Sequence, residues 1–261
     1  FCKWILPWTE MARKSLILSL NCKNFLEKIR TVHLAVTPKR FKRRRIDDKV
    51  RLFFVGTKNI FNIPYNFELK GGYVVLSAFE QLMKDFPNLE LIIRSQVPSH
   101  VKRKYGRWKN VWIIDSLISE SELANLFISA DVFVFPGHHT PGRAILDAMS
   151  YGLAVVATDV WANREMVKNK VTGFLVRKSR NLKYYDKNFV PLWGEPEFLR
   201  RALETDQSMV DDLIDKLTVL ITNRKLREAM GRAGKMEIDK GKFSIAKRNK
   251  VLKKMFNEVT G

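Results

Sequence analysis

Short apolar runs that alternate with helical patterns are the feature that most restricts the fold of this chain. The runs are rich in Val, Ile, Leu and Phe and occupy residues 51–56, 89–93, 111–114, 131–135, 154–157 and 173–176. Apolar side chains from Val75 to Phe86 recur at helical spacing and stop before Pro87, which indicates a helix. Strands that are apolar throughout and separated by helices build a parallel sheet covered on both faces. We therefore expect an α/β fold with a Rossmann-like parallel sheet, helices on both faces and a helical C-terminal tail.

Local signals predict where several of these elements begin and end. Ser119 followed three residues later by Glu122 is a capping-box pattern, which predicts a helix start. Gly152 follows a helical stretch and predicts a left-handed helix end. Residues 224–230 predict another helix, which we expect to end at Gly231.

The chain carries a large excess of positive charge, which favours an anionic partner. It has 47 Lys+Arg against 27 Asp+Glu, a formal net charge of +20. The basic residues gather at 39–45, 102–104 and 235–254, far apart in the sequence. Because the clusters are dispersed and no RNA-binding motif is present, a nucleic-acid-binding module ranks below a phosphorylated ligand or an anionic membrane surface. Each cluster is equally compatible with a solvated face.

Composition excludes several other classes of protein. Two cysteines, Cys2 and Cys22, exclude a disulfide-stapled scaffold and a four-cysteine zinc site. No apolar run approaches the roughly 18–20 residues that cross a bilayer, so we expect a cytoplasmic protein. Phe1 stands where an initiator Met would be, and we interpret the chain as a fragment. Neither a G-x-G-x-x-G nor a P-loop string occurs.

The loops that follow the apolar runs are where a parallel sheet binds its ligands. Residues 57–69 contain several turn residues and are predicted to form one such loop. Residues 136–142 form another, which leads into a helix near Gly142. Free N–H groups at a helix start favour a phosphate, and glycine lets a ligand approach the backbone closely. Asp147 lies about one helical turn further on, where it could hold ribose hydroxyls; the alternative is an ordinary crossover with a surface aspartate.

Four stretches of the chain carry a resemblance to a known family. Residues 130–136, 147–160, 165–167 and 172–176 include Ala130-Asp-Val-Phe-Val-Phe-Pro136 and Asp147-Ala-Met-Ser-Tyr-Gly152. In that order they resemble the donor-binding domain of the family-four retaining glycosyltransferases, which have the GT-B architecture of two facing Rossmann-like domains. The resemblance implies three regions: a remnant of the acceptor domain and the linker in residues 1–48, the donor-binding domain in 49–235, and an amphipathic helix in 236–261.

The resemblance also implies roles for single residues. Lys70, which precedes a glycine, stands where the family's lysine pairs with the donor diphosphate. The arginine expected after the glycine of the first strand is replaced by Thr57, and Lys58 is the nearest substitute. His139 and Asp147 stand where the family has two glutamates, of which the first contacts the donor sugar and the second the ribose.

These positions together form the predicted site. Its catalytic residues are Lys70 and His139, and its donor-binding residues are Lys58, Lys70, His139, Thr140, Pro141, Gly142, Arg143 and Asp147. The implied activity is retaining hexosyl transfer from a nucleotide-diphosphate sugar to a glycan or a lipid-linked acceptor. No cofactor or metal is expected, and the enzyme is expected to be incomplete in this fragment. The pair His138-His139 has no third metal ligand at suitable spacing, and Glu165 is expected to cap or brace a loop.

Two other functions remain open at this point. A non-catalytic glycosyltransferase-like subunit is favoured by His139 and Asp147, which replace two glutamates. A basic nucleic-acid-binding module is favoured only by the net charge of +20. The same charge fits a glycosyltransferase held peripherally on the inner face of a membrane, near a lipid-linked acceptor.

Overall fold

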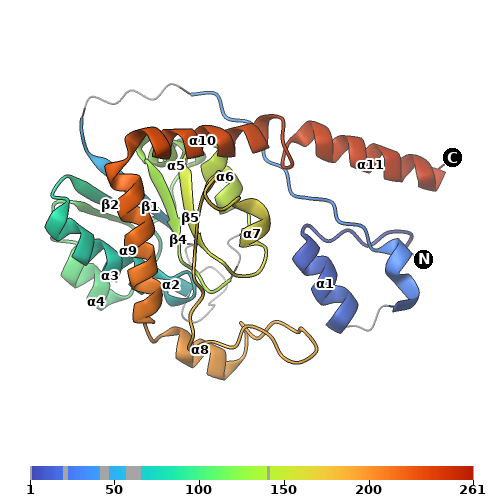
Figure 1. Ribbon diagram of the computed structural model, residues 1–261, viewed down its shortest axis with the longest axis horizontal. Helices are drawn as coiled ribbons and strands as arrows, with labels where there is room; N and C mark the ends of the chain where they lie inside the picture. The colour runs from blue at the N-terminus through green and yellow to red at the C-terminus, as the bar shows by residue number, and fades with distance from the viewer. Residues whose placement is uncertain (1, 20–22, 42–46, 57–65, 140–141, 261) are drawn as a thin grey trace.

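A six-stranded parallel sheet forms the centre of the computed structural model, which describes residues 2–19, 23–41, 47–56, 66–139 and 142–260 (Figure 1). The strands stand in the order β3-β2-β1-β4-β5-β6. Their bounds are β1 (Val50–Val55), β2 (Leu89–Arg94), β3 (Val111–Ile114), β4 (Val132–Phe135), β5 (Ala154–Thr158) and β6 (Gly173–Val176). The order reverses between β1 and β4, and such a switch point is where an open α/β sheet binds its ligand. The predicted α/β fold is therefore confirmed.

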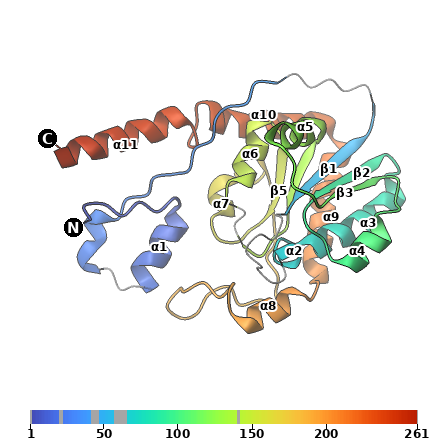
Figure 2. The ribbon, with the colours of Figure 1, turned by 180° about the vertical axis from the view of Figure 1, so that it is seen from behind.

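Helices connect and cover the strands. In chain order they are α1 (Glu10–Ser19), α2 (Asn66–Leu69), α3 (Gly72–Asp85), α4 (Ser99–Tyr105), α5 (Glu120–Ser129), α6 (Ala144–Ser150), α7 (Asn163–Met166), α8 (Pro196–Ala202), α9 (Gln207–Thr222), α10 (Arg224–Asp239) and α11 (Ile245–Thr260), with a 3-10 helix at Lys23–Lys28. Figures 1 and 2 show α1 and α11 on the same side of the sheet, where both ends of the chain lie. No described helix is long and apolar enough to cross a membrane.

The core has two layers because neighbouring residues of each strand face opposite sides of the sheet. Phe53 and Phe54 are successive residues of β1, and both are fully buried. Phe54 belongs to the core cluster that α3 and α9 complete. Phe53 belongs to the other cluster, where its ring centroid lies 5.0 Å from that of Phe127 of α5. Burial of one such side chain contributes about 1.5–3 kcal/mol, so apolar residues on both faces hold the sheet between the helices.

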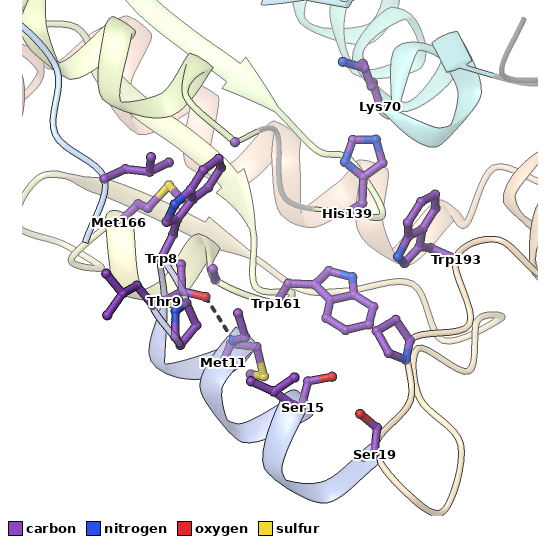
Figure 3. A pocket seen from close by; sticks show the side chains of 18 of the residues that line it. Trp8, Thr9, Met11, Ser15, Ser19, Lys70, His139, Trp161, Met166 and Trp193 are labelled. Atoms are coloured by element: carbon purple, nitrogen blue, oxygen red, sulfur yellow. Dashed lines mark hydrogen bonds between the residues drawn. The ribbon is translucent and has the colours of Figure 1, made fainter. Parts of the chain in front are cut away.

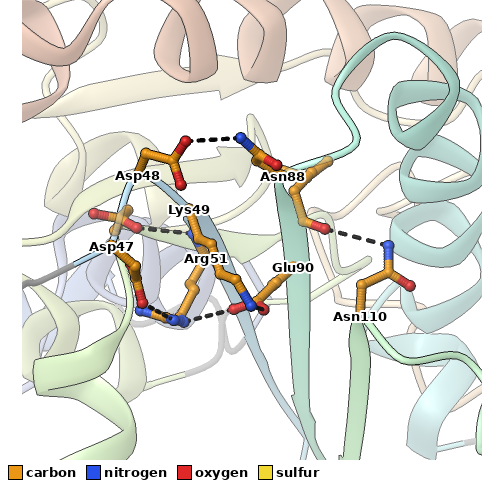
Figure 4. A network of polar contacts seen from close by, with 9 residues as sticks. Asp47, Asp48, Lys49, Arg51, Asn88, Glu90 and Asn110 are labelled. Atoms are coloured by element: carbon orange, nitrogen blue, oxygen red, sulfur yellow. Dashed lines mark hydrogen bonds and ion pairs between the residues drawn. The ribbon is translucent and has the colours of Figure 1, made fainter.

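The amino ends of the strands carry a network in which buried charges are paired (Figure 4). Glu90 of β2 is 3% exposed and accepts hydrogen bonds from Arg51 Nε at 2.7 Å and from Lys49 Nζ. Arg51 also pairs with Asp47, and its backbone N–H donates to Asp131 at 2.8 Å. A buried charge without a partner is costly, and this edge of the sheet avoids that cost.

Two of the predicted helix ends are confirmed. The side chain of Ser119 accepts a hydrogen bond from the backbone N–H of Glu122 at 3.2 Å, and the carboxylate of Glu122 accepts one from the backbone N–H of Ser119 at 2.8 Å. Gly152 follows α6 with φ +65°, in the left-handed region. Both features depend on a few neighbouring residues, which is why the sequence alone specifies them.

Three expectations were wrong in detail. Residues 66–69, predicted to be loop, form α2. The helix predicted to end at Gly231 continues to Asp239 as α10. The amphipathic helix expected over residues 236–261 is divided, because α10 takes the first part and α11 begins only at Ile245. In addition, the pattern did not predict α4, which follows β2.

The role of Gly231 explains the second difference. A Cβ at this position would lie 2.0 Å from the carbonyl oxygen of Gly152, so α10 packs with its backbone against the turn that follows α6. The glycine therefore permits a close helix contact inside a helix, where the sequence pattern predicts an end. Tertiary packing offsets the lower helix propensity of glycine, a difference of about 1 kcal/mol.

We predict that Gly231→Ala destabilises the protein because its new methyl group meets backbone that cannot move aside cheaply. The loss in free energy of unfolding should be about 1–3 kcal/mol, measured by urea denaturation. Gly194→Ala is the matched control, since no atom lies within 4 Å of a Cβ there. Equal midpoints for the two variants would contradict this account of the contact between α10 and the turn after α6.

Candidate functional site

A hollow of about 840 Å³ opens where the loops after β1, β4 and β5 meet α1 (Figure 3). Lys70 and His139 lie at one end of it, and the side chains of α1 lie at the other. Its lining also includes three tryptophans, Trp8, Trp161 and Trp193, together with Gly142 and apolar residues such as Met11 and Met166. The hollow therefore has one wall at the carboxyl ends of the strands, as the topology predicts.

Lys70 is the most unusual group in this wall. The residue is 9% exposed, and no hydrogen bond or ion pair to its ammonium group is found among the described residues. Burial and the nearby charge of Arg94 lower the pKa of Lys70 to about 8. A buried ammonium group without a partner is a site at which an anion gains free energy by binding.

Close backbone packing holds Lys70 against the loop that follows β4. Gly71 has φ +79°, and a Cβ there would lie 2.2 Å from the carbonyl oxygen of Pro136. A Cβ at Gly137 would lie 3.2 Å from the Cα of Lys70. Only glycines allow the two segments to approach so closely, and this contact brings the predicted lysine to the predicted loop.

His138 fixes the shape of that loop and takes no part in the hollow. Its backbone N–H donates to Leu69 O at 2.8 Å, and its carbonyl oxygen accepts from Trp161 Nε1 at 3.1 Å. Its ring nitrogen Nδ1 lies 3.3 Å from the hydroxyl of Tyr184. Burial lowers the pKa of His138 to about 4, so the ring is neutral at neutral pH. Its neighbour His139 is half-buried, lines the hollow and lies with its ring 5.9 Å from that of Phe135.

The structure separates the remaining predicted residues. Gly142 lines the hollow with φ +62°, and a Cβ there would meet no atom within 4 Å. Arg143 and Asp147 do not belong to the described lining; they pair with each other, with Arg143 Nε 3.1 Å from Asp147 Oδ1. Burial raises the pKa of Asp147 in spite of this pair. Three further predicted residues lie outside the described residues: Lys58, Thr140 and Pro141.

Glu165 builds the opposite wall. Its carboxylate accepts hydrogen bonds from the backbone N–H groups of Glu10 at 2.8 Å and Met11 at 2.7 Å, which are the first residues of α1. A carboxylate at a helix N-terminus satisfies free N–H groups and interacts favourably with the helix dipole. Glu165, which was expected to cap or brace its loop, thus caps the N-terminus of α1, a helix that lines the hollow.

Sequence reasoning missed the aromatic lining and Arg94. Trp161 has φ +49°, a strained conformation for a bulky residue, and is held by its hydrogen bond to His138 and by Tyr185, whose ring centroid lies 4.3 Å away. Arg94 is the last residue of β2. A charged residue at the carboxyl end of an apolar strand is the sequence signal that could have identified it. The described residues contain no cluster of three or more His, Cys, Asp or Glu that could hold a metal ion.

Comparison with known proteins gives a family and several relatives. The model of the family described as "Glycosyl transferases group 1" matches residues 49–187. The putative glycosyltransferase YtcC of Bacillus subtilis is 21% identical over 66% of this chain and 43% of its own length. The phosphatidyl-myo-inositol mannosyltransferase of Mycobacterium tuberculosis is 29% identical over 43% of this chain and 30% of its own length. The chain thus spans less than half of the curated relatives it matches.

Solved structures share the fold at low identity. The sucrose-phosphate synthase of Thermosynechococcus elongatus superposes with a TM-score of 0.69 at 14% identity, over 98% of this chain and 58% of that one. The Anabaena protein Alr3699/HepE, crystallised with UDP and glucose, gives a TM-score of 0.65 at 12% identity, over 98% of this chain and 63% of that one. These likenesses confirm the predicted Rossmann-like architecture.

Proposed function

Since the chain belongs to the glycosyl transferases group 1 family, we propose that its hollow binds a nucleotide-diphosphate sugar as the donor for glycosyl transfer. The observation that carries the proposal is the buried ammonium group of Lys70, which has no partner among the described residues and lines the hollow with His139 and Gly142. A diphosphate supplies the missing negative charge. That Alr3699/HepE was crystallised with UDP and glucose supports this choice of ligand.

The proposed reaction transfers a hexosyl group with retention of its anomeric configuration. The bond between the anomeric carbon and the diphosphate oxygen breaks, and its electron pair leaves with the diphosphate. The acceptor oxygen forms the new bond and gives its proton to the departing diphosphate. Lys70 stabilises the charge that develops on the diphosphate, which typically contributes a factor of about 10²–10³ in rate for one well-placed donor. The imidazole of His139 is placed to hydrogen-bond a sugar hydroxyl.

The other predicted donor-binding residues differ in how directly their surroundings support a role in donor binding. Gly142 leaves room for a phosphate beside the backbone. Asp147 lies outside the described lining of the hollow and pairs through Oδ1 with Arg143, whose side chain is exposed. We propose in addition that the acceptor is a glycan or a lipid-linked glycan. A non-catalytic subunit is the second candidate, and His139 and Asp147, which replace the two glutamates expected from the family, favour it.

The first test is donor binding by calorimetry with a panel of UDP-, GDP- and ADP-sugars. We expect one donor to bind, and Lys70→Ala to weaken its binding by about tenfold or more, since a charge-assisted hydrogen bond is lost. Lys109→Ala is the matched control, because Lys109 is an exposed lysine that does not belong to the described lining of the hollow. No heat from any donor would contradict the proposal. Binding without transfer by the full-length protein, in the wild type and in the double variant His139→Glu, Asp147→Glu alike, would select the non-catalytic subunit.

Donor affinity should also depend on pH in a defined direction. With a pKa of about 8, Lys70 is charged below that pH in the free protein and loses its proton above it. The bound diphosphate favours the charged form, so affinity stays level below pH 8 and falls as the pH rises further. Lys70→Arg should remove the fall, because arginine stays charged throughout. An equal fall in both proteins would show that another group titrates.

We propose that α11 contacts an anionic membrane surface. Its residues Lys250, Lys253 and Lys254 are exposed, and so are the apolar residues Val251 (45%) and Phe256 (63%). A helix with basic and apolar residues in solvent can lie on a lipid surface, where each lysine contributes about 1 kcal/mol.

Replacement of these three lysines by glutamine should weaken binding to vesicles that contain phosphatidylserine by about 100-fold. Sedimentation with anionic and with neutral vesicles measures the effect. The control variant carries glutamine at three exposed lysines elsewhere, Lys109, Lys183 and Lys187. If the two variants lose binding equally, net charge explains the binding and α11 has no special role.

A further inference from the structure

Arg94 ends β2 directly beside the end of β1. Val55 and Arg94 are register partners, and the backbone N–H of Gly56 donates to Arg94 O at 2.8 Å. The side chain is half-buried, and its Nε is buried with no hydrogen-bond partner among the described residues. Arg94 therefore stands at the carboxyl edge of the sheet, next to the position where the chain leaves β1 for the segment that leads to Lys70.

Arg94 and Lys70 form a pair of like charges. They lie close enough for the charge of Arg94 to contribute to the lowered pKa of Lys70, and no anion from the described residues bonds to either side chain. Two neighbouring cations that are both partly removed from water repel each other, and their desolvation is uncompensated. A ligand with two adjacent negative charges would relieve both costs.

Two other arginines, one half-buried and one buried, show that such a pair is not general here. Arg51 bonds to Glu90 and Asp47. Arg227 is 6% exposed; it donates to the carbonyl oxygen of Leu220, and its Nε lies 3.9 Å from Asp131. Away from the hollow, buried guanidinium groups thus find acceptors within the chain. Arg94 differs: it does not belong to the described lining of the hollow, but it stands at the carboxyl edge of the sheet, and no acceptor among the described residues bonds to its Nε.

We propose that Arg94 binds the donor diphosphate together with Lys70 and so supplies the second cation of the site from the end of β2. This inference rests on the proposed function and adds a residue to it. Thr57, the residue that follows the glycine after β1, carries no charge, so β1 does not supply that cation at this position. A guanidinium presents several N–H groups in a planar fork and an ammonium presents a point charge, and the two together can engage both phosphoryl groups.

Binding of UDP and of inorganic pyrophosphate, measured by calorimetry at pH 7, tests this assignment. Arg94→Gln should weaken the binding of both ligands by about tenfold or more, and Arg94→Lys should restore part of it because the charge returns without the fork. Arg103→Gln is the matched control, because it removes the same charge from an exposed position on α4. Thermal unfolding of each variant checks that the fold is kept.

A second measurement separates a binding role from a structural one. Removal of the charge of Arg94 removes one cause of the lowered pKa of Lys70, so the fall in UDP affinity above pH 8 should move to higher pH in Arg94→Gln. Arg94→Lys, which keeps the charge, should leave that profile in place, so an equal shift in both variants would indicate a change in packing instead. If Arg94→Gln does not fold, Arg94→Lys decides: we expect severalfold weaker pyrophosphate binding, and unchanged binding would overturn the assignment.

The outcomes distinguish this inference from the proposed function. UDP binding that is lost in Lys70→Ala but kept in a folded Arg94→Gln overturns the role of Arg94 and leaves the donor site intact. Pyrophosphate binding that needs Arg94, without binding of any nucleotide-sugar, supports the anion site and overturns the donor function. If the wild-type protein binds none of these ligands, both are wrong.

Discussion

The burial of positive charge without an anionic partner, at the carboxyl edge of the sheet, is the constraint on which the functional interpretation depends. Lys70 is 9% exposed and unpaired among the described residues. At the amino edge, by contrast, the buried carboxylate of Glu90 is paired with Arg51 and Lys49 (Figure 4). The same sheet is thus neutralised at one edge and left positive at the other. A diphosphate at the positive edge completes the pairing that the chain itself does not supply.

The fold keeps this charge in place through contacts that do not involve the charge itself. Gly71 and Gly137 let the segment around Lys70 touch the loop after β4. The neutral ring and the backbone of His138 hold that loop against Leu69, Tyr184 and Trp161. Glu165 then attaches α1 as the opposite wall. Contacts within the chain therefore hold the walls of the hollow, and such preorganisation lowers the entropic cost of binding.

Much of the fold and part of the site could be predicted from the sequence, because they depend on short-range patterns. The apolar runs located all six strands, and the pair Ser119 and Glu122 located the start of α5. The family resemblance placed Lys70 and the loop after β4 in one site, and the structure brings the two together through Gly71 and Gly137. The features that sequence did not reveal depend on partners far along the chain. Gly231 continues a helix only because Gly152 lies against it, and Arg143 is engaged by Asp147.

The most direct test of the central claim is the pKa of Lys70 itself, measured by NMR titration of its side-chain amine with and without a bound UDP-sugar. The account predicts a pKa of about 8 in the free protein, which rises when the donor binds because the diphosphate stabilises the ammonium form. A pKa near the ordinary value of about 10.4 for lysine, unchanged by saturating donor, would contradict it.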